Sequence, residues 1–342
     1  MSEWYEVLSR LGLEVEGYAV RRRRRDVSSG FTRVTTEVLL FGGGDVGCGE
    51  DVTYDVDDHE GFPTHLTLAR DGSLGGFLDR FDYLPLFPDE PRRPASRDHR
   101  RWAFESAALD LALRQASASL GEALGLEYRP VRFVVSTRLD IRPWLELYPH
   151  LEFKLDPTPD WDRELMTQIG RCSCVRVMDF KSYYTGTPVD VEPDPALYRA
   201  VVTAFPAVVI EDPWLEGECG EALRGAEERL SWDAPIHSWA DVEALPFASR
   251  FLNVKPSRFG SLARLLEFLA RAREADITLY GGGQFELGPG RSQIQALASL
   301  FYADGPNDVA PMGYNEPEAR AGLPTSPLAP PAHPVGLSFD GE

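Results

Sequence analysis

Short apolar segments, separated mostly by helical patterns, recur along the chain between residues 131 and 311. We expect eight strands in this region: Val131–Ser136, Leu151–Leu155, Cys174–Phe180, Ala207–Asp212, Leu230–Asp233, Phe251–Lys255, Ile277–Tyr280 and Asp308–Pro311. Helices are expected between most of them, for example at Pro195–Ala204 and Arg291–Tyr302. Strands that alternate with helices are typical of a parallel sheet closed into a barrel. The sequence therefore predicts an α/β protein with a TIM-type (β/α) barrel, whose chemistry would lie at the carboxyl ends of the strands.

The N-terminal part of the chain has a different pattern, which predicts a separate α+β domain. Strands are expected at Glu14–Val20, Thr32–Phe41 and Val46–Gly49, with turns rich in glycine and serine between them. The predicted ranges are 1–97 for this domain, 98–315 for the barrel, and 316–342 for a proline-rich tail that packs on the N-terminal domain.

A run of five arginines, Arg21 to Arg25, follows the first predicted strand. It could form an anion-binding patch, or it could be a hairpin strand whose arginines alternate between two faces. We favour the hairpin strand, because the run lies beside a predicted turn and does not belong to a basic domain.

Charge and apolar pattern exclude several kinds of partner. The net charge of −19 argues against a nucleic-acid partner, which requires a basic face. No apolar run approaches the roughly 20 residues of a membrane span, and no basic region followed by an apolar one begins the chain, so we expect no membrane partner and no signal peptide. The cysteines, Cys48, Cys172, Cys174 and Cys219, lack zinc-site spacing and are interpreted as small, semi-buried residues of a protein in the reducing cytoplasm.

Charged residues lie at the predicted ends of successive strands. They are Lys154, Asp179 with Lys181, Glu211, Asp233, Lys255 and Glu286. Three of them, Asp179, Glu211 and Asp233, are carboxylates on consecutive strands and should converge at one mouth of the barrel. Packed together, carboxylates repel one another unless a cation neutralises them, and oxygen ligands suit Mg²⁺. The spacing therefore predicts a magnesium site, with Mn²⁺ as a possible replacement.

The stretch Phe251 to Gly260 predicts a lysine inside the barrel mouth. Its apolar run carries Lys255, breaks at Pro256, and is followed by leucines at helical spacing, which indicate a helix. Lys255 should therefore end a buried strand and point into the space that the strand lines. Because a lysine is rarely buried without a partner, carboxylates should lie nearby.

Five short motifs point in the same direction. They are Val-Gly-Cys-Gly-Glu (46–50), Phe-Lys-Leu-Asp (153–156), Val-Ile-Glu-Asp-Pro (209–213), Asn-Val-Lys-Pro-Ser-Arg-Phe-Gly (253–260) and Tyr-Gly-Gly-Gly-Gln-Phe-Glu (280–286). In this order they resemble the Gly-x-Gly-Glu of the capping domain, the Lys-x-Lys strand, the second metal-ligand motif, the lysine-base motif and the Gly-Gly-x-x-x-Glu turn of the enolase superfamily, in its muconate lactonizing and mandelate racemase branches. The match runs nearly end to end. It is specific for the superfamily but not for one reaction.

The resemblance implies a fold and a chemistry. The fold is a modified barrel with an α+β capping domain, built from the N-terminus and the C-terminal tail, whose loops at Ser28–Thr32 and Asp51–Tyr54 close on the substrate. Asp179, Glu211 and Asp233 would hold the metal. The implied reaction removes the proton alpha to the carboxylate of a small acid, with the metal stabilising the resulting enediolate. Relatives are commonly oligomeric, so a homo-oligomer is possible.

The lysines carry the implied acid and base roles. Lys255 would act on one face of the substrate, and Lys154 would belong to the lysine pair on the other face. Two departures affect that second face. Asp156 stands where the resemblance leads us to expect the second lysine, and Lys181 stands where an asparagine is usual. Lys181 is either a replacement acid/base or substrate clamp, or the ion-pair partner of Asp156 or of a metal-site carboxylate.

The remaining candidates concern the substrate. Glu286 either binds it or holds Lys255, and Ser136 would contribute to side-chain recognition. We expect a lyase or cycloisomerase that uses one base, because Asp156 beside a bound carboxylate would be a poor base. A racemase or epimerase is the alternative reaction. A non-catalytic, ligand-binding relative is the alternative from another functional class, and the altered lysine pair is the feature that favours it.

Overall fold

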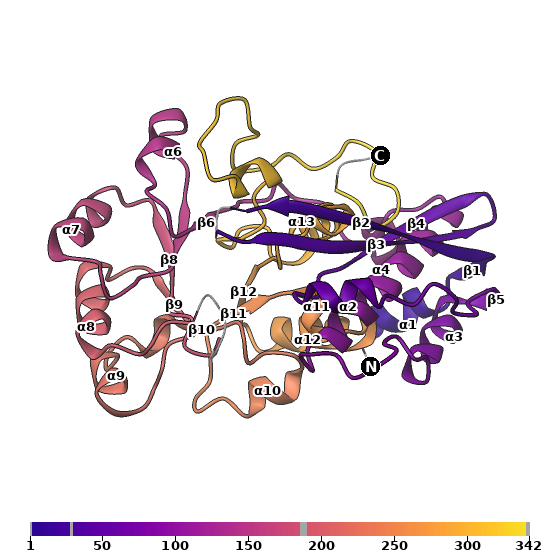
Figure 1. Ribbon diagram of the computed structural model, residues 1–342, viewed down its shortest axis with the longest axis horizontal. Coiled ribbons are helices and arrows are strands. Elements are labelled where there is room, and N and C mark those ends of the chain that lie inside the picture. Colours follow the sequence, from indigo (N-terminus) through magenta and orange to yellow (C-terminus); the bar gives the residue numbers. More distant parts are fainter. Residues whose placement is uncertain (1, 28–29, 185–189, 340–342) are drawn as a thin grey trace.

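The computed structural model describes residues 2–27, 30–184 and 190–339 (Figure 1). Long antiparallel strands lie on the right of Figure 1, and the parallel strands of the barrel lie to their left. Within the described ranges, no helix has both the length and the apolar character that crossing a membrane requires.

Antiparallel strands form the framework of the N-terminal part. One pair is β1 (Gly12–Val15) with β5 (Arg70–Ser73), and a three-stranded sheet has the order β2 (Gly17–Asp26), β3 (Thr32–Gly42) and β4 (Asp45–Asp51). The short helices of this part are α1 (Glu3–Ser9), α2 (Val56–Glu60), α3 (Leu74–Leu78) and the 3-10 helix η1 (Asp79–Asp82). The strand predicted at Glu14–Val20 is divided, so that β1 ends at Val15 and β2 begins at Gly17.

The arginine run is the second half of β2 and pairs with β3 along its whole length. Arg21 and Arg23 form ion pairs with the buried Glu37 of β3, and the side chain of Arg21 is 60% exposed. Arg22 donates a hydrogen bond to the His59 carbonyl. The interpretation of this run as a largely solvated hairpin strand is therefore confirmed.

Helix α4 (Ser96–Gln115) packs on β3 and β4 and also contacts α11 (Pro256–Phe259) of the barrel. Two strand glycines permit its close approach. A Cβ on Gly47 would lie 2.3 Å from the Ala107 carbonyl oxygen, and a Cβ on Gly49 would lie 1.9 Å from that of Ala103. The domain boundary predicted at residue 97 stays a prediction. It falls at the beginning of α4, the helix that joins the sheet to the barrel.

The barrel consists of short parallel strands in sequential order. These are β6 (Val135–Thr137), β7 (Phe153–Leu155), β8 (Val175–Asp179), β9 (Val209–Glu211), β10 (Leu230–Trp232), β11 (Phe251–Val254) and β12 (Thr278–Gly281). Each overlaps one predicted apolar segment, and the predicted barrel fold is confirmed.

The eighth predicted strand, Asp308–Pro311, is not a strand in the structure. Single parallel bridges replace it, from Asp308 to Gly282 and from Asn307 to Phe133. They join the segment to the end of β12 and to the residues before β6, so it closes the sheet at the place expected for the eighth strand. Pro306 and Pro311 flank the segment, and their missing backbone N–H groups prevent a longer ladder.

Helices follow most of the barrel strands. They are α6 (Arg142–Leu147), α7 (Arg163–Arg171), α8 (Pro195–Ala204), α9 (Gly217–Ala222), α10 (Trp239–Glu243), α12 (Leu262–Glu274) and α13 (Pro289–Phe301), with 3-10 helices η2 (Glu227–Arg229) and η3 (Met312–Asn315), whereas α5 (Leu120–Leu124) precedes β6. The leucines predicted to form the apolar face of α12 are buried. The helical period read from the sequence therefore gave the correct face.

The C-terminal tail contacts the barrel first and α4 afterwards. Leu328 forms an antiparallel bridge with Val131, which precedes β6. Further on, the Leu337 amide donates a hydrogen bond of 2.8 Å to Asp110 of α4. The last described part of the tail therefore lies against the helix that covers the N-terminal sheet.

Two of the cysteines differ from their interpretation as free, semi-buried residues. Cys172 and Cys174 are joined by a disulfide, with their Cα atoms 5.2 Å apart. This separation is within the reach of the bond, although only one residue lies between them. Cys48 and Cys219 are free.

A buried ion pair connects α4 with the end of β4. The Arg100 and Asp51 side chains are fully buried and lie 2.8 Å apart, from Nε to Oδ2. Arg100 also donates hydrogen bonds to the carbonyls of Leu86 and Asp58. Burial acts to raise the pKa of Asp51, but Arg100, His59 and the hydrogen bond from Thr53 together hold that pKa below its ordinary value. Arg100 is the largest of these stabilising partners.

We predict that Arg100→Met lowers the free energy of unfolding by about 3–5 kcal/mol, because the variant leaves Asp51 buried and unpaired. Arg97→Met is the matched control on the same helix, since Arg97 pairs with Glu90 where the side chains are 54% and 75% exposed. That exposed pair should contribute at most about 1 kcal/mol. Urea denaturation of both variants measures the difference, and equal losses would contradict the prediction.

Candidate active site

Three carboxylates meet where neighbouring barrel strands end. Asp179 is the last residue of β8, Glu211 is the last residue of β9, and Asp233 follows β10. The register pairs Asp179 with Glu211 across the first two strands. One carboxylate oxygen from each of the three lies within 4.8 Å of the others, and all three side chains are buried. The structure thus brings together the residues that the sequence predicted as metal ligands.

The chemistry of this cluster fits a hard divalent cation. Its ligand atoms are carboxylate oxygens, which Mg²⁺ and similar ions prefer. Burial and the neighbouring Asp179 and Asp233 raise the pKa of Glu211 to about 8, even though Lys154 acts in the opposite direction. Burial and the same two aspartates raise the pKa of Asp212 to about 7. Protein cations therefore compensate the negative charge here only in part.

Lys154 lies between two members of the cluster. Its ammonium group is 2.9 Å from Asp179 Oδ2 and also forms an ion pair with Glu211 Oε1. Burial acts to lower the pKa of Lys154, but Asp179 and Glu211 outweigh it and raise that pKa well above its ordinary value. This lysine is held as a cation.

Lys181 also reaches the cluster, as predicted, but it does so from beyond the strand, where side-chain alternation does not apply, since β8 ends at Asp179. Its ammonium group forms a hydrogen bond with Asp179 Oδ2 and lies 3.7 Å from Asp156 Oδ1. The residue has a positive φ of 56°, which is uncommon for a residue with a side chain. The ion pairs that the sequence offered as one interpretation of Lys181 are present, with both Asp179 and Asp156.

Lys255 has a different environment from the other two lysines. It contacts one carboxylate, with its Nζ 2.8 Å from Asp233 Oδ2, and Arg258 binds the same carboxylate. Tyr184 donates a third hydrogen bond to it at 2.8 Å. Burial, together with Arg258, lowers the pKa of Lys255, although Asp233 opposes the shift. Lys255 is therefore shifted toward its neutral form, whereas Lys154 is shifted toward its charged form.

Several neighbours of the cluster were not singled out in the sequence. Tyr280 and Asn253 both donate hydrogen bonds to Glu211 Oε2. A signal for Asn253 existed, because it lies two residues before Lys255 and so shares its face of β11. Tyr280 is paired with Asn253 in the register of the next strand. Arg258 and Tyr184 lie outside the strands, where no such periodicity applies.

The two predicted substrate-binding residues lie in different settings. Ser136 is the middle residue of β6 and is paired in register with Lys154. Glu286 is buried in the loop after β12, where it accepts a hydrogen bond from the Gln284 amide and lies 3.5 Å from Arg291. Among the described residues, no hydrogen bond or ion pair links Glu286 to Lys255. The structure thus gives no direct contact for the suggestion that Glu286 holds this lysine.

The predicted capping segment at residues 51–54 contacts the barrel loop that carries Glu286. Tyr54 donates a hydrogen bond of 2.9 Å to the Gln284 side chain, and the buried Arg33 guanidinium lies 4.3 Å from the centre of the Tyr54 ring. Arg33 also donates to the Gln284 carbonyl. Ser28 and Ser29 of the other predicted capping loop lie outside the described residues.

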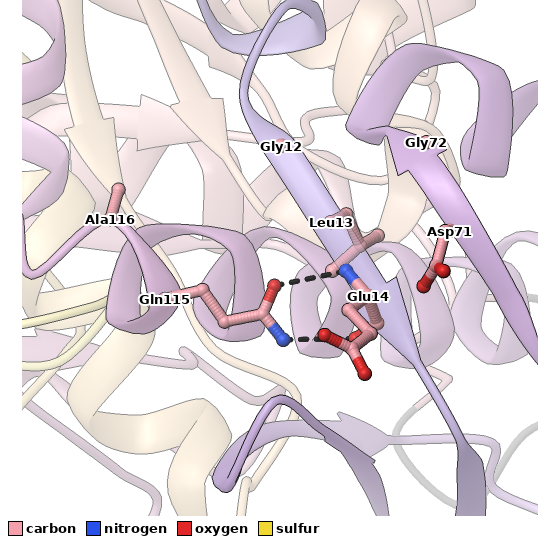
Figure 2. A pocket seen from close by; sticks show the side chains of 7 residues that line it. All are labelled: Gly12, Leu13, Glu14, Asp71, Gly72, Gln115 and Ala116. Atoms are coloured by element: carbon pink, nitrogen blue, oxygen red, sulfur yellow. Dashed lines mark hydrogen bonds between the residues drawn. The ribbon is translucent and has the colours of Figure 1, made fainter.

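A separate hollow lies on the N-terminal part, remote from this chemistry. Figure 2 shows its lining side chains, with hydrogen bonds between Gln115 and Glu14. The lining is formed by Gly12, Leu13, Glu14, Asp71, Gly72, Gln115 and Ala116. None of the strand-end residues contributes to it, so we do not regard it as the active site.

Comparisons with known proteins agree with this fold. A family model described as the C-terminal domain of a domain of unknown function (DUF8230) matches residues 127–316, and its N-terminal counterpart matches residues 6–123. An o-succinylbenzoate synthase from Enterococcus faecalis is 26% identical over 223 residues, which cover 61% of this chain and 59% of that protein.

Solved structures extend the likeness to nearly the whole chain. A member of the enolase superfamily from Listeria innocua has a TM-score of 0.63 at 18% identity, covering 88% of this chain and 86% of that one. A dipeptide epimerase from Methylococcus capsulatus, solved with Mg and the dipeptide L-Arg-D-Lys, has a TM-score of 0.67 at 17% identity, covering 95% and 99%. The predicted resemblance to the enolase superfamily is therefore confirmed.

We predict that Glu211→Gln weakens the binding of a divalent cation by at least about 100-fold, because loss of a ligand should exceed the roughly 10–100-fold effect of losing an outer partner. Glu286→Gln is the matched control, since it changes a buried carboxyl that lies outside the cluster. Isothermal titration with Mg²⁺ measures both. Equal affinities of the two variants would remove Glu211 from the cation site.

Proposed function

The chain belongs to the DUF8230 family and has the fold of the enolase superfamily, and on this basis we propose that it is a metal-dependent enzyme that removes the proton alpha to a carboxylate. The observation that carries the proposal is the buried cluster of Asp179, Glu211 and Asp233, surrounded by three lysines. The chain spans 59% of the length of its o-succinylbenzoate synthase relative, so any substrate assigned to this chain is part of the proposal.

Asp179, Glu211 and Asp233 would hold Mg²⁺, for which Mn²⁺ is the natural replacement. When bound, such a cation supplies positive charge to stabilise the negative charge that develops on the substrate carboxylate. Magnesium is also named for the dipeptide epimerase of similar fold. The substrate would be a small carboxylic acid, and the protein would act in the cytoplasm without a nucleic-acid or membrane partner.

Lys255 is proposed as the base. It contacts a single carboxylate, which it shares with Arg258, and its pKa is lowered by burial first and by Arg258 in addition. A base must be neutral to accept a proton, and a lowered pKa raises the neutral fraction near neutral pH. Lys255 would remove the alpha proton and hold it on Nζ.

Lys154 and Lys181 are proposed to act as cations on the other side of the cluster. Each contacts two carboxylates, which keep it protonated. In this state they orient the substrate and oppose its negative charge, and neither is ready to accept a proton. We therefore propose a one-base reaction, an elimination or a cycloisomerisation.

Epimerisation is the second candidate, and one observation favours it. The ammonium groups of both Lys154 and Lys181 reach the carboxylate cluster, from strands β7 and β8, whereas Lys255 approaches from β11. A proton donor on each side of the substrate carbon is what an epimerase requires. The dipeptide epimerase of similar fold makes dipeptides the first epimerisation substrates to test.

We predict that the enzyme incorporates deuterium from D₂O at the alpha carbon of its substrate and that Lys255→Ala abolishes this exchange. A panel of mandelate, muconate derivatives and dipeptides, followed by proton NMR with Mg²⁺ present, tests this. With one base, exchange should occur in one enantiomer only. Equal exchange into both enantiomers would instead establish the two-base epimerase, and full exchange by Lys255→Ala would remove Lys255 from the mechanism.

We also predict a pH profile for kcat/KM that rises with pH and reaches its plateau below 10.5, the ordinary pKa of lysine. The sign follows from the role of Lys255: only its neutral form accepts a proton, and its pKa is lowered. Stability measured at each pH by circular dichroism separates unfolding from titration. A rate that is still rising above pH 10.5 would contradict the assignment.

A further inference from the structure

Asp156 carries a buried acceptor without a donor. Its Oδ2 accepts a hydrogen bond of 2.9 Å from Arg138 Nε, which holds the carboxylate in place. Its Oδ1 is buried and receives no hydrogen bond from any described residue. Leaving a buried charged oxygen unsatisfied costs free energy, so such atoms in native structures call for an explanation.

Lys181 forms an ion pair with this oxygen, but its hydrogen bond goes elsewhere. Lys181 Nζ lies 3.7 Å from Asp156 Oδ1, beyond hydrogen-bond distance, and donates its hydrogen bond to Asp179 Oδ2. The Lys181 side chain is only 12% exposed, so solvent offers its ammonium group little alternative. Asp179 Oδ2 is in addition 2.9 Å from Lys154 Nζ. Asp179 Oδ2 therefore has two close ammonium partners, whereas Asp156 Oδ1 has only the longer ion pair with Lys181 and, among the described residues, no hydrogen bond.

We propose that Lys181 is a two-position side chain that controls cation binding at the carboxylate cluster. It pairs with Asp179 in the structure described above, and it turns to Asp156 Oδ1 when a divalent cation occupies the cluster. The inference rests on the proposed function, because it takes Asp179 to be a cation ligand. It requires no change in protonation, since Lys181 remains charged in both positions.

Two physical requirements support the movement. A divalent cation bound to Asp179 would repel the Lys181 ammonium group, and the two would compete for the same carboxylate oxygen. An ammonium displaced into a low-dielectric region needs another anion, because an unpaired buried charge is costly. Asp156 supplies that anion at 3.7 Å, already oriented by Arg138 and with one oxygen unoccupied.

The two residues should therefore have opposite effects on cation affinity. Lys181→Met removes the competing ammonium and should strengthen Mg²⁺ binding by about 10-fold. Asp156→Asn removes the anion that receives the displaced ammonium and should weaken it by about 10-fold, as is usual for partners outside the ligand shell. In the Lys181→Met background, Asp156→Asn should lose most of its effect, because no ammonium remains to be received.

Asp308→Asn is the matched control for charge alone. Asp308 forms the bridge to Gly282 at the same mouth. Burial raises its pKa, and the lysines oppose this shift, Lys154 and Lys255 more than Lys181. No hydrogen bond or ion pair joins its side chain to Lys181 among the described residues. Asp308→Asn should therefore weaken Mg²⁺ binding less than Asp156→Asn, and its effect should be similar with and without Lys181.

The experiment is isothermal titration of the full chain and these variants with Mg²⁺ alone, with urea denaturation to confirm that each variant is folded. The proposal is supported if Lys181→Met binds more tightly and if Asp156→Asn weakens binding more in the wild-type background than in the Lys181→Met background. Weaker binding by Lys181→Met, or equal effects of Asp156→Asn in both backgrounds, would overturn it.

A structural measurement covers the case in which a variant does not fold. Crystal structures of the wild-type chain with and without Mg²⁺ should show Lys181 Nζ at hydrogen-bond distance from Asp156 Oδ1 only with the ion. An unmoved Lys181 would overturn this proposal alone, provided that Glu211→Gln still weakens binding. If the wild-type chain binds no Mg²⁺, or if Glu211→Gln has no effect, the metal site of the proposed function fails together with it.

Discussion

Burial of opposite charges at one end of a parallel sheet is the constraint on which the rest of the structure depends. Asp179, Glu211 and Asp233 have no exposed surface, and each contacts at least one lysine or arginine. Charges removed from water are costly unless they are paired and hydrogen-bonded. The register of the strands sets the positions of these charged groups. The geometry of the barrel and the pairing of charges at its mouth therefore depend on each other.

The loops that cover this mouth are attached to the barrel by a second buried carboxylate. Glu50, at the end of β4, accepts hydrogen bonds from the amides of Leu287, Gly288 and Gly290 at the beginning of α13. A carboxylate is favourable there, because the first amides of a helix have no partners within it. The N-terminal sheet thus completes a helix of the barrel, and the loop between β12 and α13 is held from both sides.

This attachment bears on recognition of the substrate. The loop after β12 carries Gln284 and Glu286, and Gln284 is contacted by Arg33 of β3 and by Tyr54 of the predicted capping segment. Residues from both parts of the chain therefore share one network beside the lysines. Under the proposed function, substrate specificity would therefore depend on both parts of the chain.

The sequence predicted the parts of the molecule that follow from period and spacing. Apolar runs located seven barrel strands. The place of Lys181 at the mouth was predicted correctly, but from strand alternation that does not extend to it, because β8 ends at Asp179. The eighth strand was predicted at the right place but forms only bridges, because flanking prolines limit its ladder. The hydrogen bonds of Arg258 and Tyr184 could not be predicted, since these residues reach Asp233 from the short helix α11 and from the loop after β8, whose positions depend on tertiary packing.

The exchange of residue types between β7 and β8 shows why charge must be considered across strands. Lysine would be expected at position 156 and asparagine at position 181, yet the chain has Asp156 and Lys181. When each strand is considered alone, the residue at position 156 removes a base and the residue at position 181 adds a cation without an evident role. In the structure the two side chains lie 3.7 Å apart, so the ammonium group remains at the mouth but approaches from β8. That position brings it to Asp179, which the proposal makes a ligand of the cation and which Lys154 of β7 also contacts, so two ammonium groups share this carboxylate.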